Sequence, residues 1–89
     1  MNVWIIERVE NGETFLNVFS SRRKYLNAFK KYIRGFRAYF KDYITNVSEQ
    51  ETHYIPLSTY KLHIKDYFGK PYHIEMYVYV GKIDSENYQ

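Results

Sequence analysis

The sequence contains no cysteine, only two proline and four glycine residues, and no long apolar run. Without cysteine the chain has no disulfide, no thiolate metal ligand and no cysteine nucleophile. The longest apolar segment, residues 3–6, is far shorter than the ~20 residues of a membrane-spanning helix or the ~7–15 of a signal peptide core. We therefore expect a soluble, cytoplasmic protein that does not associate with a membrane.

Signatures of catalysis are missing as well. There is no GxGxxG, P-loop or GxSxG motif, and His53, His63 and His73 are ten residues apart, which is not a metal-ligand spacing. His63 could pair with Glu75 across two strands, but on an open sheet such a pair is usually an ordinary surface contact. A chain of 89 residues also leaves little room for an enclosed active site. We predict a protein that is not an enzyme and uses no metal or cofactor.

Acidic residues are scarce in one segment, residues 20–43. This segment holds eight lysine and arginine residues and a single acid, Asp42, so its charge is +7, whereas the other 65 residues sum to −4 and the whole chain to +3. The modest net charge thus conceals a strongly polarised molecule.

The first 19 residues predict a β-hairpin. Residues 3–9 and 14–19 are rich in the β-branched and aromatic residues that strands prefer. The Asn-Gly pair at 11–12 suits a two-residue type I′ turn, in which both central residues need a positive φ. Such a turn places Ile5 opposite Val18.

The period then changes to that of a helix. Apolar residues recur three or four positions apart at Leu26, Phe29, Ile33, Phe36, Phe40 and Tyr43, and Ser20 and Ser21 can each cap the start. Gly35 lies inside the segment, but the apolar period continues past it. We predict one helix from about residue 21 to residue 44, with a kink at Gly35 left open.

The second half of the chain predicts another hairpin. Residues 45–52 are polar and acidic, as in a connecting loop, and apolar residues then alternate with polar ones in residues 60–65 and 73–80. Matching the apolar faces places Ile64 opposite Ile74, which would bring His63 to Glu75.

The expected fold class is α+β in the order ββαββ. Two hairpins would form a four-stranded antiparallel sheet, with one long helix packed on one face. Residues 1–80 would make a single domain, and residues 81–89 a frayed C-terminal tail.

The candidate binding residues lie on two surfaces. On a helical wheel at 100° per residue, one flank beside the apolar stripe gathers Arg23, Lys30, Arg34, Arg37 and Lys41. The sheet face away from the helix carries cations among aromatic rings, including Lys61, Lys65 and Tyr77, and an ordinary polar outer face is the alternative interpretation. A row of cations can follow a phosphodiester backbone, and arginine forms forked bonds to phosphate. Cations among aromatic rings are typical of surfaces that hold single-stranded RNA.

Other interpretations of the basic helix remain open. Many lysine-rich helices simply present a solvated face, but these usually interleave acidic residues four positions away, and here only Asp42 is present. The same cations would fit an acidic protein surface. Tyr25, Tyr32 and Tyr39, seven residues apart, form a second flank that would sit at the core boundary, stack on bases or join a homodimer. An edge strand is the other route to a homodimer.

The N-terminal half resembles small early accessory proteins of tailed bacteriophages. The resemblance covers about residues 1–45, through the opening MNVWII, the Asn-Gly turn, FLNVFSS and the Lys/Tyr-rich segment that follows. It implies a host-takeover or counter-defence role in the host cytoplasm, such as binding the RNA of a toxin–antitoxin or similar ribonucleoprotein system. Many inhibitors of this kind are acidic mimics of nucleic acid. The basic segment departs from that pattern, so DNA mimicry is not expected.

Together these observations predict a non-catalytic protein that binds nucleic acid, with RNA favoured over DNA. The alternative is an inhibitor that docks its basic helix on an acidic host protein.

Overall fold

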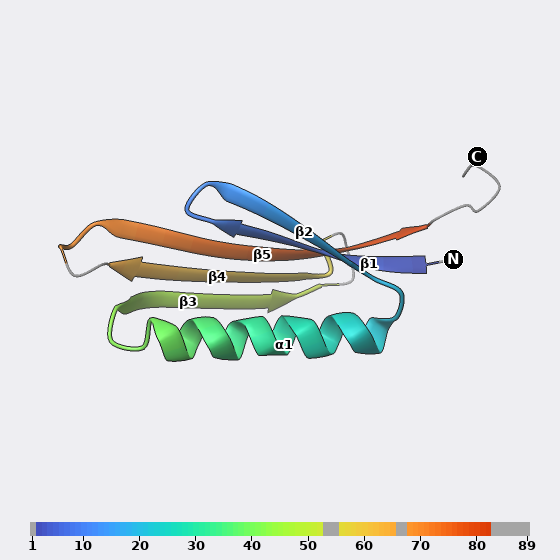
Figure 1. Cartoon of the computed structure of the whole chain (residues 1–89), viewed down its shortest axis with the longest axis horizontal. Helices are drawn as coiled ribbons and strands as arrows, with labels where there is room; N and C mark the ends of the chain where they lie inside the picture. The colour runs from blue at the N-terminus through green and yellow to red at the C-terminus, as the bar shows by residue number, and fades with distance from the viewer. Residues whose placement is uncertain (1, 53–55, 66–67, 83–89) are drawn as a thin grey trace.

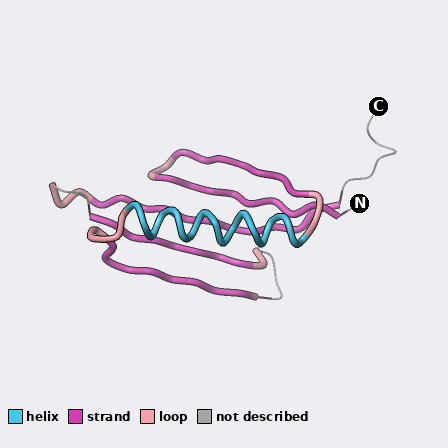
Figure 2. Tube along the Cα trace, turned by 60° about the horizontal axis from the view of Figure 1, so that its bottom comes forward, coloured by secondary structure: helices cyan, strands magenta, loops and turns pink. Residues whose placement is uncertain are grey.

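The part of the chain that the structure describes forms one antiparallel sheet with a single helix on one face (Figure 1). The computed structural model describes residues 2–52, 56–65 and 68–82. Its elements are β1 (Asn2–Glu10), β2 (Glu13–Phe19), α1 (Arg22–Tyr39), β3 (Ile44–Glu51), β4 (Ser58–Lys65) and β5 (Pro71–Lys82). The strand order is β2-β1-β5-β4-β3, and α1 runs lengthwise along the sheet (Figure 2). The predicted α+β class is confirmed.

The sheet has five strands, so the prediction of four is wrong. The additional strand is β3, which pairs with β4 in the segment predicted as a loop. The register shifts between Ile44 and Asn46, and this irregularity lets Ile44 and Val47, three positions apart, lie opposite Ile64 and Leu62. Both are partly buried against the core. The spacing of three hid the strand, because an unbroken strand repeats every two residues.

The first hairpin is as predicted. Ile5 lies opposite Val18, and the turn residues Asn11 and Gly12 have φ values of 50° and 93°. Both positive values are those that a type I′ turn needs.

The second hairpin has a different register from the predicted one. Leu62, not Ile64, lies opposite Ile74, so the strands are displaced by two residues. A displacement of two keeps every side chain on its predicted face, and matching apolar faces therefore cannot detect it. As a result His63 faces His73 and Glu75 faces Lys61, and the expected His63–Glu75 pair does not form.

The helix is shorter than predicted. It begins after Ser21, whose hydroxyl oxygen accepts a hydrogen bond from the Lys24 N–H at 3.2 Å, and it runs unbroken through Gly35. Its last residue is Tyr39, because the backbone of the capping residue Phe40 leaves the helical conformation at φ −101° and ψ 18°. The apolar period continued past the end because Phe40 still packs on the core, with its ring 5.7 Å from Tyr72.

The core lies between α1 and the sheet. Its fully buried members come mainly from the three central strands and are Ile6, Tyr60, Leu62, Ile74, Met76 and Val78. From the helix, Tyr25 is buried and its ring stacks on Trp4 at 6.2 Å. Helix side chains on the opposite side of α1 are therefore free to face solvent.

The last strand extends beyond the predicted domain boundary at residue 80. Gly81 and Lys82 still pair with Val3 and Asn2 in β1. The frayed tail was predicted from residue 81, and its remaining part, residues 83–89, lies outside the described residues.

Candidate nucleic-acid interface

The predicted binding residues separate onto two opposite surfaces. Arg23, Lys30, Arg34 and Arg37 project from α1, and Lys41 lies in the turn that follows it. Lys61, Lys65 and Tyr77 alternate with the buried residues of β4 and β5, so they lie on the sheet face away from α1. The helix and the sheet together separate the two groups, as the sequence pattern predicted.

The group on α1 and in the turn after it forms a row of exposed cations. We call it the cationic ridge, made up of Arg23, Lys30, Arg34, Arg37 and Lys41, and all five residues are exposed. Arg23 and Arg37 are 14 residues apart (37 − 23), or ~21 Å at 1.5 Å per residue. Arg22 and Lys31, which the wheel leaves outside this flank, are exposed too, so the basic surface is wider than predicted.

Among the described residues, none of the ridge cations forms an ion pair with an acid. Within residues 2–52, 56–65 and 68–82, the one ion pair joins Arg8 Nε to Glu10 Oε2 at 3.7 Å, and both residues belong to β1. Unpaired cations in a row add their potentials and attract anions. The geometry thus agrees with the expectation, drawn from the shortage of acids in residues 20–43, that this basic surface is available to an anionic ligand.

The start of the helix adds to this positive potential. Its first turn contains no acidic residue but does contain Arg22, Arg23 and Lys24. Cations at this end oppose the helix dipole, at a cost of about 0.3–1 kcal/mol each at exposed positions. If folding stability alone were selected, acidic residues would be favoured in the first turn of α1. A bound anionic ligand would offset the unfavourable interaction of these cations with the helix dipole.

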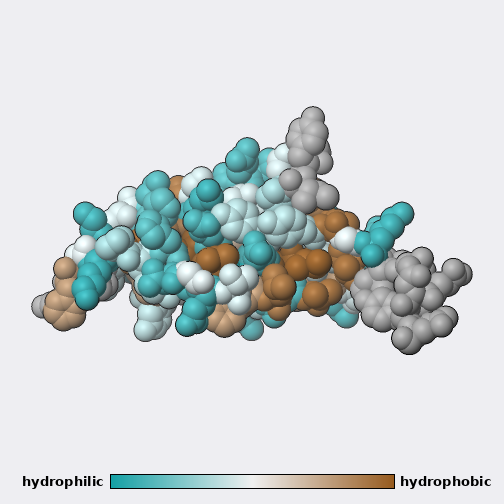
Figure 3. All heavy atoms as spheres, turned by 90° about the horizontal axis from the view of Figure 1, so that it is seen from above, coloured by the Kyte–Doolittle hydropathy of each residue, from teal (hydrophilic) through white to brown (hydrophobic). Residues whose placement is uncertain are grey.

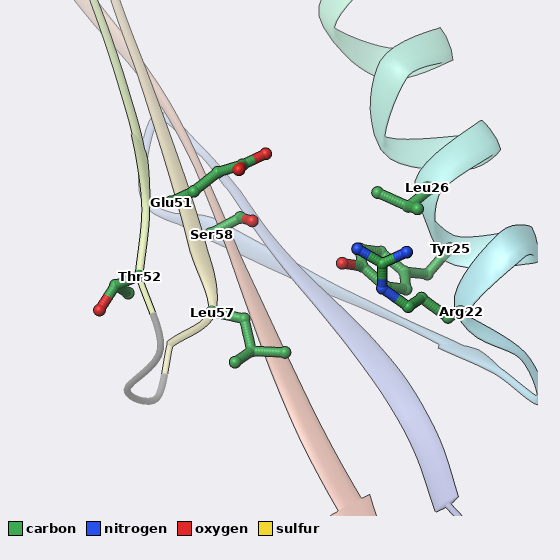
Figure 4. A pocket seen from close by; sticks show the side chains of 7 residues that line it. All are labelled: Arg22, Tyr25, Leu26, Glu51, Thr52, Leu57 and Ser58. Carbon is green, nitrogen blue, oxygen red and sulfur yellow. The ribbon is translucent and has the colours of Figure 1, made fainter.

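Acids of the sheet edge lie near the ridge along one side of α1. A groove between α1 and β3 is lined by Lys30 and by Glu49, Gln50 and Glu51, among others. Near the start of α1 the groove opens into a cleft of about 500 Å³, where Arg22, Tyr25 and Leu26 face Glu51 and Ser58 across the gap (Figure 4). Because both signs of charge line this cleft, it interrupts the basic surface rather than extending it.

The helix tyrosines offer little surface for stacking on bases. Tyr25 is 4% exposed and Tyr32 is half-buried, with its hydroxyl donating to Asn17 Oδ1 at 3.4 Å. The Tyr32 ring also covers the Arg8 guanidinium, 4.7 Å from its centroid. Only Tyr39 is open, at 81% exposure, and its ring packs edge-on to Phe40. Two of the three tyrosines therefore belong to the core boundary.

Hydrogen bonds occupy the tyrosines of the open sheet face. The Tyr77 hydroxyl donates to Glu75, and the Tyr79 hydroxyl donates to Glu7 Oε1 at 3.5 Å. Burial, followed by the Glu75 contact, raises the pKa of Tyr77 to about 12. Lys61 lies opposite Glu75, so cation and acid neighbour each other here. This face carries balanced charge, unlike the ridge.

Two of the three histidines pack against each other on the open sheet face. His63 and His73 pack edge-to-face at 4.6 Å, and His53 lies outside the described residues. In the part of the chain that the structure describes, no three His, Cys, Asp or Glu residues come together as metal ligands. In the same part, no helix has the length and apolar character of a membrane span.

Comparisons with protein-family models, with curated proteins and with solved structures found no match for this chain. The functional argument therefore rests on the residues themselves.

Proposed function

We propose that this protein binds the sugar–phosphate backbone of RNA along the cationic ridge, without catalysis. The observation that carries the proposal is the set of exposed ridge cations without an ion-pair partner among the described residues. Each cation that engages a phosphate releases condensed counterions, which favours binding. Arginines in the row add forked bonds to phosphate oxygens.

The ridge is the principal site, and the open sheet face is secondary. A single strand that follows the ridge cannot also reach Lys61, Lys65 and Tyr77 without passing around an edge of the sheet. The Tyr77 hydroxyl is engaged by Glu75, so this residue has less to offer a ligand than the sequence suggested.

An acidic protein surface is the second candidate ligand. It is favoured by the lack of open aromatic rings on the ridge, because Tyr25 and Tyr32 face the sheet. Sequence-tolerant RNA binding commonly adds base stacking on aromatic rings to its phosphate contacts. Binding to the carboxylates of an acidic protein would require only the ridge cations and no aromatic rings.

The biological setting is also part of the proposal and rests on the resemblance to phage accessory proteins alone. In that setting the bound RNA would belong to a host or defence ribonucleoprotein, such as a toxin–antitoxin system, in the host cytoplasm. An inhibitor of an acidic host protein would act in the same setting.

The test is to purify the protein without nuclease at low salt and record its 260/280 nm absorbance ratio. With 11 Tyr and one Trp, free protein absorbs far more at 280 nm than at 260 nm. We expect an elevated ratio that RNase lowers and DNase does not, because bound RNA would copurify. A protein-like ratio from the start, together with an acidic protein captured from nuclease-treated lysate, would favour the second candidate and contradict RNA binding.

A further inference from the structure

The edge strand β2 presents an unusual surface. It is the outer strand on one side of the sheet, and its segment Thr14–Phe19 contains no charged residue, no proline and no glycine. On the face away from α1, Leu16 is 63% exposed and Val18 is 60% exposed. Figure 3 shows this face, where apolar atoms gather over one part of an otherwise polar surface. Natural proteins usually protect edge strands with charge, proline or irregularities, and β2 has none of these within this segment.

The opposite edge, β3, is protected. Its register is irregular between Ile44 and Asn46, and it carries the exposed acids Glu49 and Glu51. A strand added at β3 would have to remove these carboxylates from water. The two edges therefore differ in their capacity to pair, and a head-to-tail chain from β2 to β3 is disfavoured.

We propose that β2 pairs antiparallel with β2 of a second copy of this chain, so that the protein is a homodimer with a continuous sheet. This interface does not depend on the proposed RNA binding.

Alternate residues of β2 direct their backbone N–H and C=O groups away from β1, as this pairing requires. Glu10 and Glu13 close the two-residue hairpin and exchange hydrogen bonds across it. Hydrogen-bonded pairs alternate along the ladder, so the N–H and C=O groups of Thr14, Leu16 and Val18 point away from β1. These three residues supply the donors and acceptors that a second β2 strand would use.

Side-chain matching selects one register, with the two-fold axis at Asn17. Leu16 then lies beside the partner's Val18 on the open face, and Phe15 beside the partner's Phe19 on the helix side. Apolar groups meet apolar groups on both faces of the new strand pair. Centring the axis on Leu16 instead would place Phe15 against the partner's Asn17.

Charge supports the same antiparallel arrangement with a second copy. Glu13 begins β2, and the basic first turn of α1 follows the strand after only two residues. In the register centred on Asn17, Glu13 extends past Phe19, the last residue of the partner's β2, toward the positive end of the partner's helix. Carboxylates are favoured at that position. A parallel pairing would place acid beside acid.

The two-fold axis is perpendicular to the sheet, so both copies of α1 lie on one face. The two cationic ridges would then be presented on the same side of a wider surface. Dimerisation would enlarge the basic surface, but each copy has its own cationic ridge without it.

The first test is the mass of the full-length protein in solution, measured by light scattering after nuclease treatment and without RNA. We expect twice the 10.9 kDa of the chain at high micromolar concentration. Leu16→Lys with Val18→Lys should give monomers with an unchanged circular dichroism spectrum, because both side chains are exposed and lysine blocks edge pairing. The matched control is Ser48→Lys with Gln50→Lys on the other edge, which should remain dimeric.

A single cysteine tests the register, because the chain has none of its own. Asn17→Cys should form a disulfide between copies on oxidation, since non-hydrogen-bonded partners lie at a Cα separation of about 4.5 Å, within disulfide range. Thr14→Cys is the control. Its two copies would be offset by six positions, ~20 Å at ~3.4 Å per residue, and should not cross-link.

Several outcomes would overturn the proposal. These are a monomer at every concentration, a dimer that survives the Leu16/Val18 substitutions, or assemblies whose mass keeps growing. Cross-linking by Thr14→Cys but not by Asn17→Cys would exclude this register. Each result is independent of whether the protein binds RNA.

Discussion

The cationic ridge and the open face of the sheet carry similar residue types, but their charged groups have different neighbours. On α1 the ridge cations are exposed and have no ion-pair partner among the described residues, whereas on the open sheet face acids lie among the cations and tyrosine hydroxyls donate to carboxylates. Counting lysines and aromatic rings in the sequence makes both surfaces candidates for nucleic acid. The positions of the acids distinguish the two surfaces, because a cation without an ion-pair partner remains available to a ligand.

The largest expected effect comes from reversing charge on the two surfaces in parallel. Arg34→Glu with Arg37→Glu should weaken binding of a short single-stranded RNA by about tenfold or more, since two phosphate contacts are lost and two repulsions gained. Lys61→Glu with Lys65→Glu changes the net charge equally on the open face and should weaken binding by about twofold at most. Fluorescence anisotropy with labelled RNA measures both, and circular dichroism checks the fold. Equal losses in the two variants would remove the distinction between the surfaces.

A smaller effect, on stability, follows from the tyrosines on the two sides of the sheet. The Tyr60 hydroxyl is fully buried beneath α1 and has no hydrogen-bond partner among the residues that the structure describes, and burial is the main cause of its raised pKa. Tyr60→Phe should raise the free energy of unfolding by about 1 kcal/mol, because an unsatisfied buried group is removed. Tyr77→Phe should lower it by about 1 kcal/mol, because the bond to Glu75 is lost. Urea unfolding measures both, and changes of the same sign would contradict this account of the two sides.

The sequence was sufficient for the parts of the fold that rest on one strong local signal. The Asn11-Gly12 turn determined the first hairpin and its register, and the apolar period located α1. The predicted register of the second hairpin differs from the observed one by two residues. The connection between its strands contains no turn signal as strong as Asn-Gly, and both registers place the apolar side chains on the same face of the sheet. The helix end was missed because Phe40 keeps its apolar role after the backbone has changed.

The strand β3 could not be recognised from periodicity. Only Ile44 and Val47 are apolar in it, and the shift in pairing between them breaks the two-residue repeat. The partners that make it a strand come from β4, which follows it in the sequence. Its identification therefore needed the tertiary structure.

For the candidate site, the sequence predicted which cations share a flank of the helix, since that depends only on the helical period. It could not establish whether those cations form ion pairs, because acids such as Glu49 and Glu51 lie near them on a strand that the sequence did not reveal. Only the structure shows that, among the described residues, the ridge cations form no ion pair. Nor could the sequence show that Glu75 engages Tyr77, since the predicted register placed His63 against that acid.

The most direct test of the central claim is the salt dependence of binding to a short oligouridine. If four ridge cations engage phosphates of a single strand, log K should fall linearly with log salt at a slope of about −3, taking ~0.7 per contact. In the Arg34→Glu, Arg37→Glu variant the slope should fall to about half that value, and in the Lys61→Glu, Lys65→Glu variant it should be unchanged. A slope near zero for the native protein, or one that the ridge substitutions leave unaltered, would contradict the assignment of RNA binding to α1.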